Sequence, residues 1–244
     1  MQLRFVGCGD ALGSGGRFNT CFHVTGERAN FLIDCGASSL VALKSHGIPR
    51  EPIDVILITH FHGDHFAGLP FLLLDAQFTR RARPLVIAGP PGIETRLLQA
   101  MEALYEHSSK TKQRFDLQVV ALEAEQTRDF GTLKATPFSV VHGESGGPFF
   151  AYRIETEGRT ITYSADTEWT ETLVPAACGA DLFICEAYYY DRIVKNHLSL
   201  KTLEEHLPRI APKKLVLTHM SDDMLARIGS LPHTAACDGM VVEL

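Results

Sequence analysis

A short stretch in the first third of the chain concentrates side chains that bind metal ions. It reads ITHFHGDHFAG and continues the apolar run IDVILIT, which predicts a strand buried on both faces. Its reactive side chains are those of His60, His62, Asp64 and His65. Residues i and i+2 of an extended chain point to the same side, so His60 and His62 can hold one cation together. Asp64 and His65 follow a glycine that lets the backbone turn, and they can reach a second cation beside the first.

Four residues do not complete two metal sites, and three further strands end in a histidine or an aspartate. They are His142 after FSVV, Asp166 after TITYSA and His219 after KLVLT. Reactive groups of layered α/β proteins collect at strand ends, so we expect these three to meet the first four. Taken singly, each has a structural alternative: a hydrogen-bonded core histidine for His142 or His219, and a helix N-cap for Asp166. Imidazole and carboxylate donors suit zinc, manganese or iron.

The elements that must position these residues follow from the apolar pattern. Strands are expected at residues 2–7, 21–25, 30–35, 53–59, 84–90, 117–122, 132–142, 149–156, 159–166, 181–187, 214–220 and 239–244, and helices at 38–46, 64–82, 93–107 and 200–207. IDVILITH and KLVLTH both end in Thr-His, which indicates two related halves. No linker rich in Pro or Ser separates them, so residues 1–244 are expected to form one domain of sheets covered by helices.

Composition excludes several classes of protein. The chain has 244 residues, 45% of them hydrophobic, and a net charge of −6, which gives no electrostatic push toward nucleic acid or an anionic membrane. No signal peptide is visible and no apolar run is long enough to cross a bilayer. The six cysteines are scattered, which favours reduced, mostly buried thiols and a cytoplasmic location. The arginines in RRAR (80–83) are expected on a solvated face.

With these motifs in this order, the chain resembles the metallo-β-lactamase-fold hydrolases over nearly its full length. The resemblance implies an α/β fold, a four-layer αββα sandwich of two related halves, with a binuclear site at the strand ends between them. It implies that one metal is held by His60, His62 and His142, and the other by Asp64, His65 and His219, with Asp166 as the bridge.

Further segments resemble ribonuclease Z and its phosphodiesterase relatives: FVGCGDALGSGGRFNT, FLIDCG, YSADT, CEAYYYD and LTHMS. KNHLSL is similar to the segment that carries an extra catalytic histidine in phosphoribosyl cyclic phosphodiesterase. The tRNA-gripping arm of ribonuclease Z would lie between His142 and Asp166, which are only 24 positions apart here. The cysteine-rich zinc site common in the cyclic phosphodiesterase is not expected, because only Cys8 and Cys21 lie near the first glycine-rich loop. We therefore expect a small-molecule phosphodiester substrate, cyclic or not, and we do not expect a long nucleic acid or a membrane as a partner. Relatives are often homodimers, and both a monomer and a homodimer are compatible with this sequence.

The resemblance leads to a mechanistic expectation. Two divalent ions, zinc first and manganese or iron as alternatives, would lie about 3.5–4 Å apart and lower the pKa of a shared water from about 15.7 toward 7, so that hydroxide attacks phosphorus. Asp64 would orient this nucleophile and His197 would protonate the leaving oxygen. Glu186 and Asp34 would support the metal ligands through hydrogen bonds, and Arg17 would contact the substrate phosphate. The alternatives are an exposed histidine before a helix for His197, a buried structural carboxylate for Glu186 and a solvated arginine for Arg17.

Other functions fit the same pattern of ligands. The site would also serve a hydrolase of a thioester, lactone or β-lactam, or an RNA-processing nuclease without the arm. An iron redox enzyme on the same fold and a non-catalytic metal-binding protein are the remaining alternatives.

Overall fold

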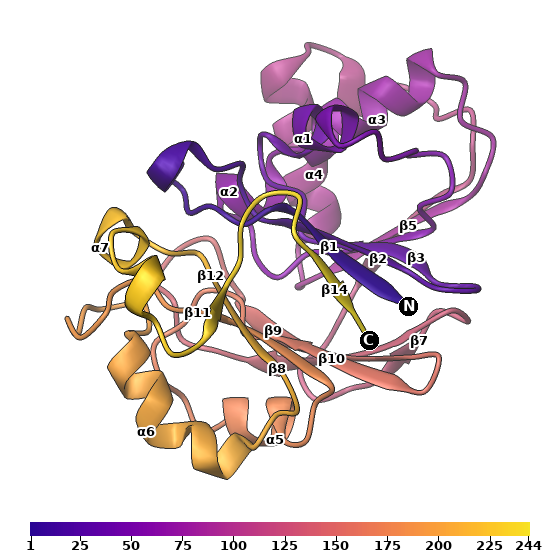
Figure 1. Ribbon diagram of the computed structural model, residues 1–244. Helices are drawn as coiled ribbons and strands as arrows, with labels where there is room; N and C mark the ends of the chain where they lie inside the picture. The colour runs from indigo at the N-terminus through magenta and orange to yellow at the C-terminus, as the bar shows by residue number, and fades with distance from the viewer.

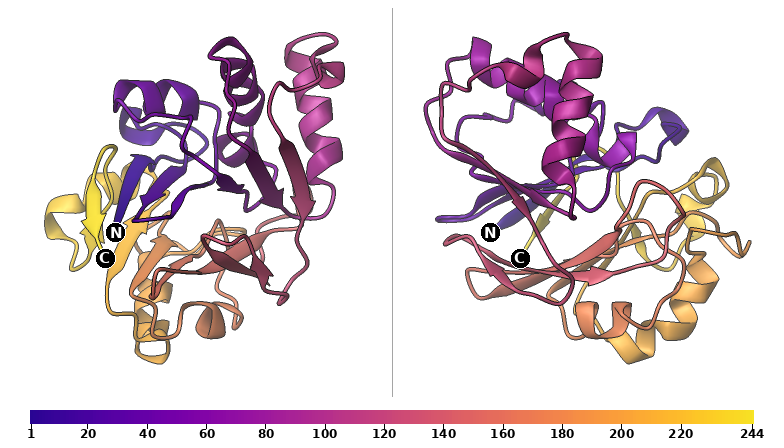
Figure 2. Two further views of the ribbon diagram at one scale, coloured as in Figure 1. Left: turned by 90° about the vertical axis from the view of Figure 1, so that its right-hand side faces the viewer. Right: turned by 180° about the vertical axis from the view of Figure 1, so that it is seen from behind.

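The computed structural model describes residues 1–244 and places two seven-stranded sheets face to face, with helices on both outer surfaces (Figure 1). Figure 2 shows the same layers from the side and from behind. This arrangement confirms the expected αββα sandwich. The order of strands is β14-β1-β2-β3-β4-β5-β6 in the first sheet and β13-β12-β11-β10-β9-β8-β7 in the second.

The first half of the chain builds the first sheet and its helices. Its strands are β1 (Gln2–Gly7), β2 (Cys21–Thr25), β3 (Asn30–Ile33), β4 (Val55–Leu57), β5 (Leu85–Gly89) and β6 (Leu117–Ala121), with β14 (Val241–Glu243) returning beside β1. The helices are α1 (Ser39–Ser45), α2 (Gly63–Phe66), α3 (Leu69–Phe78) and α4 (Ile93–Leu104), and the short 3-10 turns are η1 (Ser14–Gly16) and η2 (Ser108–Lys110). Strands β3 to β6 are parallel, so their carboxyl ends share one edge of the sheet.

The second half builds the other sheet. Its strands are β7 (Arg128–Asp129), β8 (Lys134–Ser139), β9 (Phe150–Thr156), β10 (Arg159–Tyr163), β11 (Leu182–Glu186), β12 (Leu215–Thr218) and β13 (Thr234–Ala235). The helices are α5 (Leu173–Ala177), α6 (Leu200–Ile210) and α7 (Asp222–Leu225), with the 3-10 turn η3 (Ile228–Ser230). Strands β10 to β13 are parallel, and their carboxyl ends open toward the same edge as those of β3 and β4.

Aromatic and aliphatic side chains fill the space between the sheets. The largest buried cluster holds 25 residues from both sheets. Within it, the Phe22 ring of β2 meets the Tyr163 ring of β10 edge-on at 5.0 Å between centroids, and Phe5 of β1 contacts Phe22 in the same way. Because β-strands alternate their side chains, the opposite face of the first sheet packs under the helices in a second cluster of 21 residues.

Several expectations differ from the structure in detail. The helix expected at 64–82 is two helices, α2 and α3, and β4 ends at Leu57, because the chain leaves the sheet there to reach the site. Arg81 is buried, so the expectation of a solvated face is wrong for it. Its guanidinium donates to the carbonyls of Arg50, Ile53, Arg83 and Pro84 and lies over the Phe115 ring. No two cysteines form a disulfide, and four of the six are buried. No helix has the length and apolar character needed to span a bilayer.

Truncating Phe22 tests how much the contact between the sheets stabilises the fold. Phe22→Ala removes a fully buried ring at the sheet–sheet interface, and we expect the free energy of unfolding to fall by about 3–5 kcal/mol. The matched control is Phe78→Ala at the end of α3, where the ring is 81% exposed and the change should stay within about 0.5 kcal/mol. Urea unfolding measures both variants, and equal losses would contradict this account of the core.

Candidate metal centre

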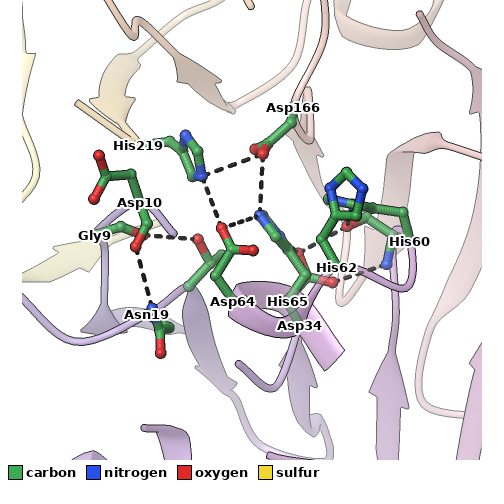
Figure 3. Close-up of polar contacts among 12 residues, drawn as sticks. Gly9, Asp10, Asn19, Asp34, His60, His62, Asp64, His65, Asp166 and His219 are labelled. Carbon is green, nitrogen blue, oxygen red and sulfur yellow. Dashed lines mark hydrogen bonds and ion pairs between the residues drawn. The ribbon is translucent and has the colours of Figure 1, made fainter. Parts of the chain in front are cut away.

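The predicted ligands come from loops at the carboxyl ends of strands in both sheets. The first sheet supplies His60 after β4 and His62, Asp64 and His65 at the turn into α2, and the second supplies His142 after β8, Asp166 after β10 and His219 after β12. Figure 3 shows side chains from both sides pointing toward a common point. All but His62 are buried.

Two glycines hold the first ligand loop against the end of β3. A Cβ on Gly36 would lie 2.1 Å from the Asp64 carbonyl oxygen, and one on Gly68 would lie 2.2 Å from the Gly36 carbonyl oxygen. The close approach allows the Cys35 N–H to donate to the His65 carbonyl at 2.7 Å and the Gly68 N–H to donate to the Cys35 carbonyl at 2.9 Å. The backbone that carries Asp64 and His65 is therefore fixed by main-chain contacts.

Three imidazoles form the first group. His62 Nδ1 lies 3.1 Å from His142 Nε2, and the His60 ring lies 4.6 Å from the His62 ring and 5.1 Å from the His142 ring between centroids. One nitrogen of each ring lies within 4.8 Å of the others, a spacing that suits three ligands of one cation.

Two carboxylates and two imidazoles form the second group. Asp64 Oδ2 lies 3.2 Å from His65 Nε2 and 3.1 Å from His219 Nε2. Asp166 Oδ2 lies 3.3 Å from His65 Nε2 and 3.2 Å from His219 Nε2, and it also lies 3.5 Å from His142 Nε2 in the first group. Asp166 thus lies between the two groups, where the resemblance puts a bridging ligand.

Unpartnered polar atoms show that the cluster fits metal ions. His60 Nε2, His65 Nε2 and Asp166 Oδ1 are buried and make no hydrogen bond. A buried polar atom without a partner costs free energy, and it is rare outside functional sites. Nitrogen and oxygen donors converging without hydrogen-bond partners match the ligand set of zinc, manganese or iron.

Charge in the second group also favours cations. Burial opposes the charged form of His65, but the carboxylates of Asp166, Asp64 and Asp34 outweigh burial and raise its pKa well above the usual value. Burial acts in the same direction on His219, and Asp166 and Asp64 still raise its pKa to about 9. In the first group, burial together with the charge of His65 lowers the pKa of His60 well below its usual value. Negative charge is therefore concentrated around Asp64 and Asp166.

Hydrogen bonds behind the ligands fix their orientation. Asp34 Oδ2 accepts from His65 Nδ1 at 2.7 Å. The same carboxylate accepts from the Thr59 N–H at 2.8 Å and from the Thr59 hydroxyl at 2.9 Å, and that hydroxyl lies 3.0 Å from His60 Nδ1. One buried carboxylate thus orients an imidazole of each group, that of His65 directly and that of His60 through Thr59. Sequence reasoning missed Thr59, although its position directly before His60 was a signal.

His197 lies beside the predicted ligands, and Glu186 lies behind it. His197 Nδ1 is 3.0 Å from Glu186 Oε2, and the His197 ring lies 4.8 Å from the His142 ring. The Tyr188 ring stacks on His197 at 4.4 Å between centroids. Burial lowers and Glu186 raises the pKa of His197, and the net shift is upward.

A cavity of about 270 Å³ opens over the cluster. Most of its lining residues are polar, and the full set is Ala11, His62, Asp64, His142, Asp166, Tyr188, Lys195, Asn196, His197 and His219. Tyr188, Lys195 and Asn196 were missed, because no spacing rule connects them to the metal motifs. Arg17 is not among the lining residues, and its guanidinium donates a hydrogen bond to the Ala236 carbonyl at 2.7 Å, so its contact with the substrate stays a prediction.

Comparison with known proteins agrees with this geometry. The family model of the anti-Pycsar protein Apyc1 matches residues 1–235. Ribonuclease Z of Agathobacter rectalis is 29% identical over 88% of this chain and 86% of its own. The human short-form tRNase Z has a TM-score of 0.80 at 26% identity and covers 100% of this chain and 99% of its own. The metallo-β-lactamase fold protein YhfI of Bacillus subtilis has a TM-score of 0.78 at 20% identity over 99% of both chains.

These relatives correct one expectation. A long nucleic acid was not expected as a partner, but the curated relatives are named ribonuclease Z and a solved structure is a tRNase Z, so this expectation is wrong. Net charge describes the whole surface, whereas recognition of a phosphodiester is local to the metal site, so a charge of −6 does not exclude nucleic acid.

The converging ligands, the sandwich fold and the family match lead to one assignment. The chain belongs to the anti-Pycsar protein Apyc1 family, and it is a metal-dependent hydrolase of the metallo-β-lactamase fold in the ribonuclease Z-like branch.

Proposed function

We propose that this protein hydrolyses small phosphodiesters, cyclic ones among them, in the cavity over the His/Asp cluster. The observation that carries the proposal is the convergence of seven donors in two groups, with Asp166 of the second group 3.5 Å from His142 of the first and with unpartnered nitrogens on His60 and His65. In the proposed site His60, His62 and His142 hold one divalent ion, and Asp64, His65 and His219 hold the other. Zinc suits these donors best, and manganese or iron remain alternatives.

The protein's own groups supply orientation and a proton. When bound, the two ions would activate a water and offset the charge of the phosphoryl oxygens. Asp64 lines the cavity and can accept a hydrogen bond from the attacking water, which orients it toward phosphorus. His60 and His65 keep their ligand nitrogens in place because Thr59 and Asp34 contact the opposite nitrogens of the rings.

His197 is the proposed proton donor to the leaving oxygen. Its Nδ1 faces Glu186, so Nε2 is the nitrogen left for the substrate. The side chain lines the same cavity as Asp64 and Asp166. Glu186 is itself held by the Thr167 N–H, which fixes the imidazole ring and its tautomer.

The size of the cavity and one cationic side chain support a small substrate. A volume of about 270 Å³ is near the lower end of ordinary ligand pockets. Residues 143–165 form the β9–β10 hairpin and its connections, with no inserted arm. Lys195 lines the cavity, and its ammonium group can reach a phosphate oxygen at the mouth.

A second candidate substrate is a phosphodiester of RNA. The names of the curated relatives favour it, and the same ligands and proton donor would serve the reaction. The two candidate substrates differ in the part that would lie outside the cavity. The bond that is cleaved, a phosphodiester, is the same in both.

A panel of substrates tests the proposal. Cyclic phosphodiesters, bis-p-nitrophenyl phosphate, short RNA, a thioester, a lactone and a β-lactam are offered to the protein loaded with zinc, manganese or iron in turn. We expect phosphodiesters to be turned over and the three other classes to be left intact. Preferential cleavage of the thioester, lactone or β-lactam would overturn the proposal, and no turnover of any compound would favour a metal-binding role. Cleavage of RNA in preference to every small phosphodiester would select the second candidate.

Replacing Asp166 tests the shared carboxylate. Asp166→Asn keeps the side-chain shape but removes the charge between the two groups, so metal content should fall below two ions per chain and activity should fall on all phosphodiesters together. Elemental analysis after gel filtration measures the metal. Asp129→Asn, which changes an exposed carboxylate of the same sheet, is the control and should retain full metal content. Full occupancy in Asp166→Asn would contradict the bridging role.

Replacing His197 tests the proton donor. His197→Ala should lower kcat about 10²-fold or more for diesters whose leaving group is an alkoxide, because general acid catalysis contributes about 10²–10⁴-fold. The loss should be much smaller for p-nitrophenolate, which leaves without a proton. His107→Ala, at an exposed histidine far from the cavity, should change neither rate. Equal losses on both substrates would remove His197 from this role.

A further inference from the structure

The loop that carries His197 leaves the edge of the second sheet and returns to α6. At its base the Tyr188 N–H donates to the Leu198 carbonyl at 2.9 Å. Residues 191–193 and Lys195 are exposed, so the tip of this loop is not packed into the hydrophobic core. A proton donor on such a segment needs contacts that hold the backbone close to it, because a small displacement of a reacting group lowers the reaction rate strongly.

Glu168 supplies a backbone anchor directly before His197. Its Oε1 accepts the Asn196 N–H at 2.7 Å. Asn196 has a φ of 75°, in the left-handed region that is uncommon for non-glycine residues, although asparagine adopts it more readily than most. A hydrogen bond to a carboxylate is among the stronger kinds and can hold this conformation.

Asn196 connects the anchor to the proposed metal centre as well. His142 Nδ1 donates to the Asn196 carbonyl at 2.7 Å. The conformation of Asn196 therefore sets the direction of this carbonyl and the path of the chain into His197.

The backbone of Glu168 is itself fixed by residues of the site. It lies two residues after Asp166, and its N–H donates to the Val141 carbonyl at 2.8 Å, next to His142. The preceding Thr167 N–H donates to Glu186, the carboxylate on His197 Nδ1. The segment after β10 thus contacts His197 by two routes, through the imidazole by way of Glu186 and through the backbone by way of Glu168.

We propose that Glu168 is a positioning residue for His197: its carboxylate holds Asn196 in the left-handed conformation that directs the imidazole of His197 toward the cavity. The inference rests on the proposed role of His197 as proton donor. Glu168 does not line the cavity, so it would act on the reaction only through the loop.

Three variants separate this role from general stability. Glu168→Ala removes the acceptor, and Glu168→Gln keeps a carboxamide oxygen that can still accept the Asn196 N–H. Glu171→Ala is the matched control, because Glu171 lies on the same segment but pairs with Arg209 and Trp169, away from the His197 loop. All assays are run at saturating metal, with metal content checked by elemental analysis.

The kinetic readout is the ratio of kcat for an alkoxide-leaving cyclic diester to kcat for bis-p-nitrophenyl phosphate. Glu168→Ala should lower this ratio about 10- to 100-fold, Glu168→Gln should restore most of it, and Glu171→Ala should leave it unchanged. In a His197→Ala background, Glu168→Ala should have no further effect on the ratio, because the two residues act as one unit. An unchanged ratio in Glu168→Ala, or a further fall in the double variant, would overturn the inference.

Hydrogen exchange provides a readout that needs no substrate. Amides of residues 188–197 should exchange faster in Glu168→Ala than in the parent protein, and near the parent rate in Glu168→Gln. Unchanged exchange in Glu168→Ala would refute the anchoring contact. If His197→Ala alone leaves the kinetic ratio unchanged, the proposed proton donor fails and the inference falls with it. If His197→Ala shows the change and Glu168→Ala does not, only the inference fails.

Discussion

The site depends on one buried carboxylate that faces imidazoles from both sheets. Asp166 Oδ2 lies within 3.5 Å of nitrogens on His65, His142 and His219, and no lysine or arginine pairs with it. Burying an ionised carboxylate costs several kcal/mol unless it is paired or bound to a metal. The imidazoles compensate this cost, and their placement requires strand ends from both halves of the chain to meet at one edge of the sandwich.

The sheets satisfy this requirement through their parallel strands. Parallel strands bring successive carboxyl ends to one edge, which is where Asp34, His60, Asp166, Glu186 and His219 lie. The hydrophobic contacts between the sheets, such as that of Phe22 with Tyr163, then hold the site residues of one sheet against those of the other. The same strands therefore carry the site residues at the edge of the sandwich and the hydrophobic side chains in its interior. Gly36 and Gly68 allow the loop with Asp64 and His65 to pack closely against the end of β3.

The sequence pattern predicted those parts of the site that depend on residues close together in the chain. The spacing of His60, His62, Asp64 and His65 after an apolar run placed all four at one strand end, and the sandwich followed from the resemblance. The tertiary contacts of Asn196 and Glu168 had no such signal, because each depends on a hydrogen bond to a residue that is distant in the sequence or on a backbone conformation. Arg81 was misjudged for a related reason: four backbone carbonyls surround its guanidinium, and no sequence pattern reports them. A long nucleic acid was set aside on overall charge and on the short interval between His142 and Asp166, and overall charge carries little information about a local site.

The segment after β10 carries Asp166, Thr167 and Glu168, and Trp169 follows them directly. Trp169 is the only tryptophan of the chain, and its ring stacks on His206 of α6 at 3.7 Å between centroids. Its indole fluorescence therefore originates from this segment alone, next to the proposed metal centre. The protein consequently contains an intrinsic optical probe, whose emission reports on this segment and on its contact with α6 without an attached dye.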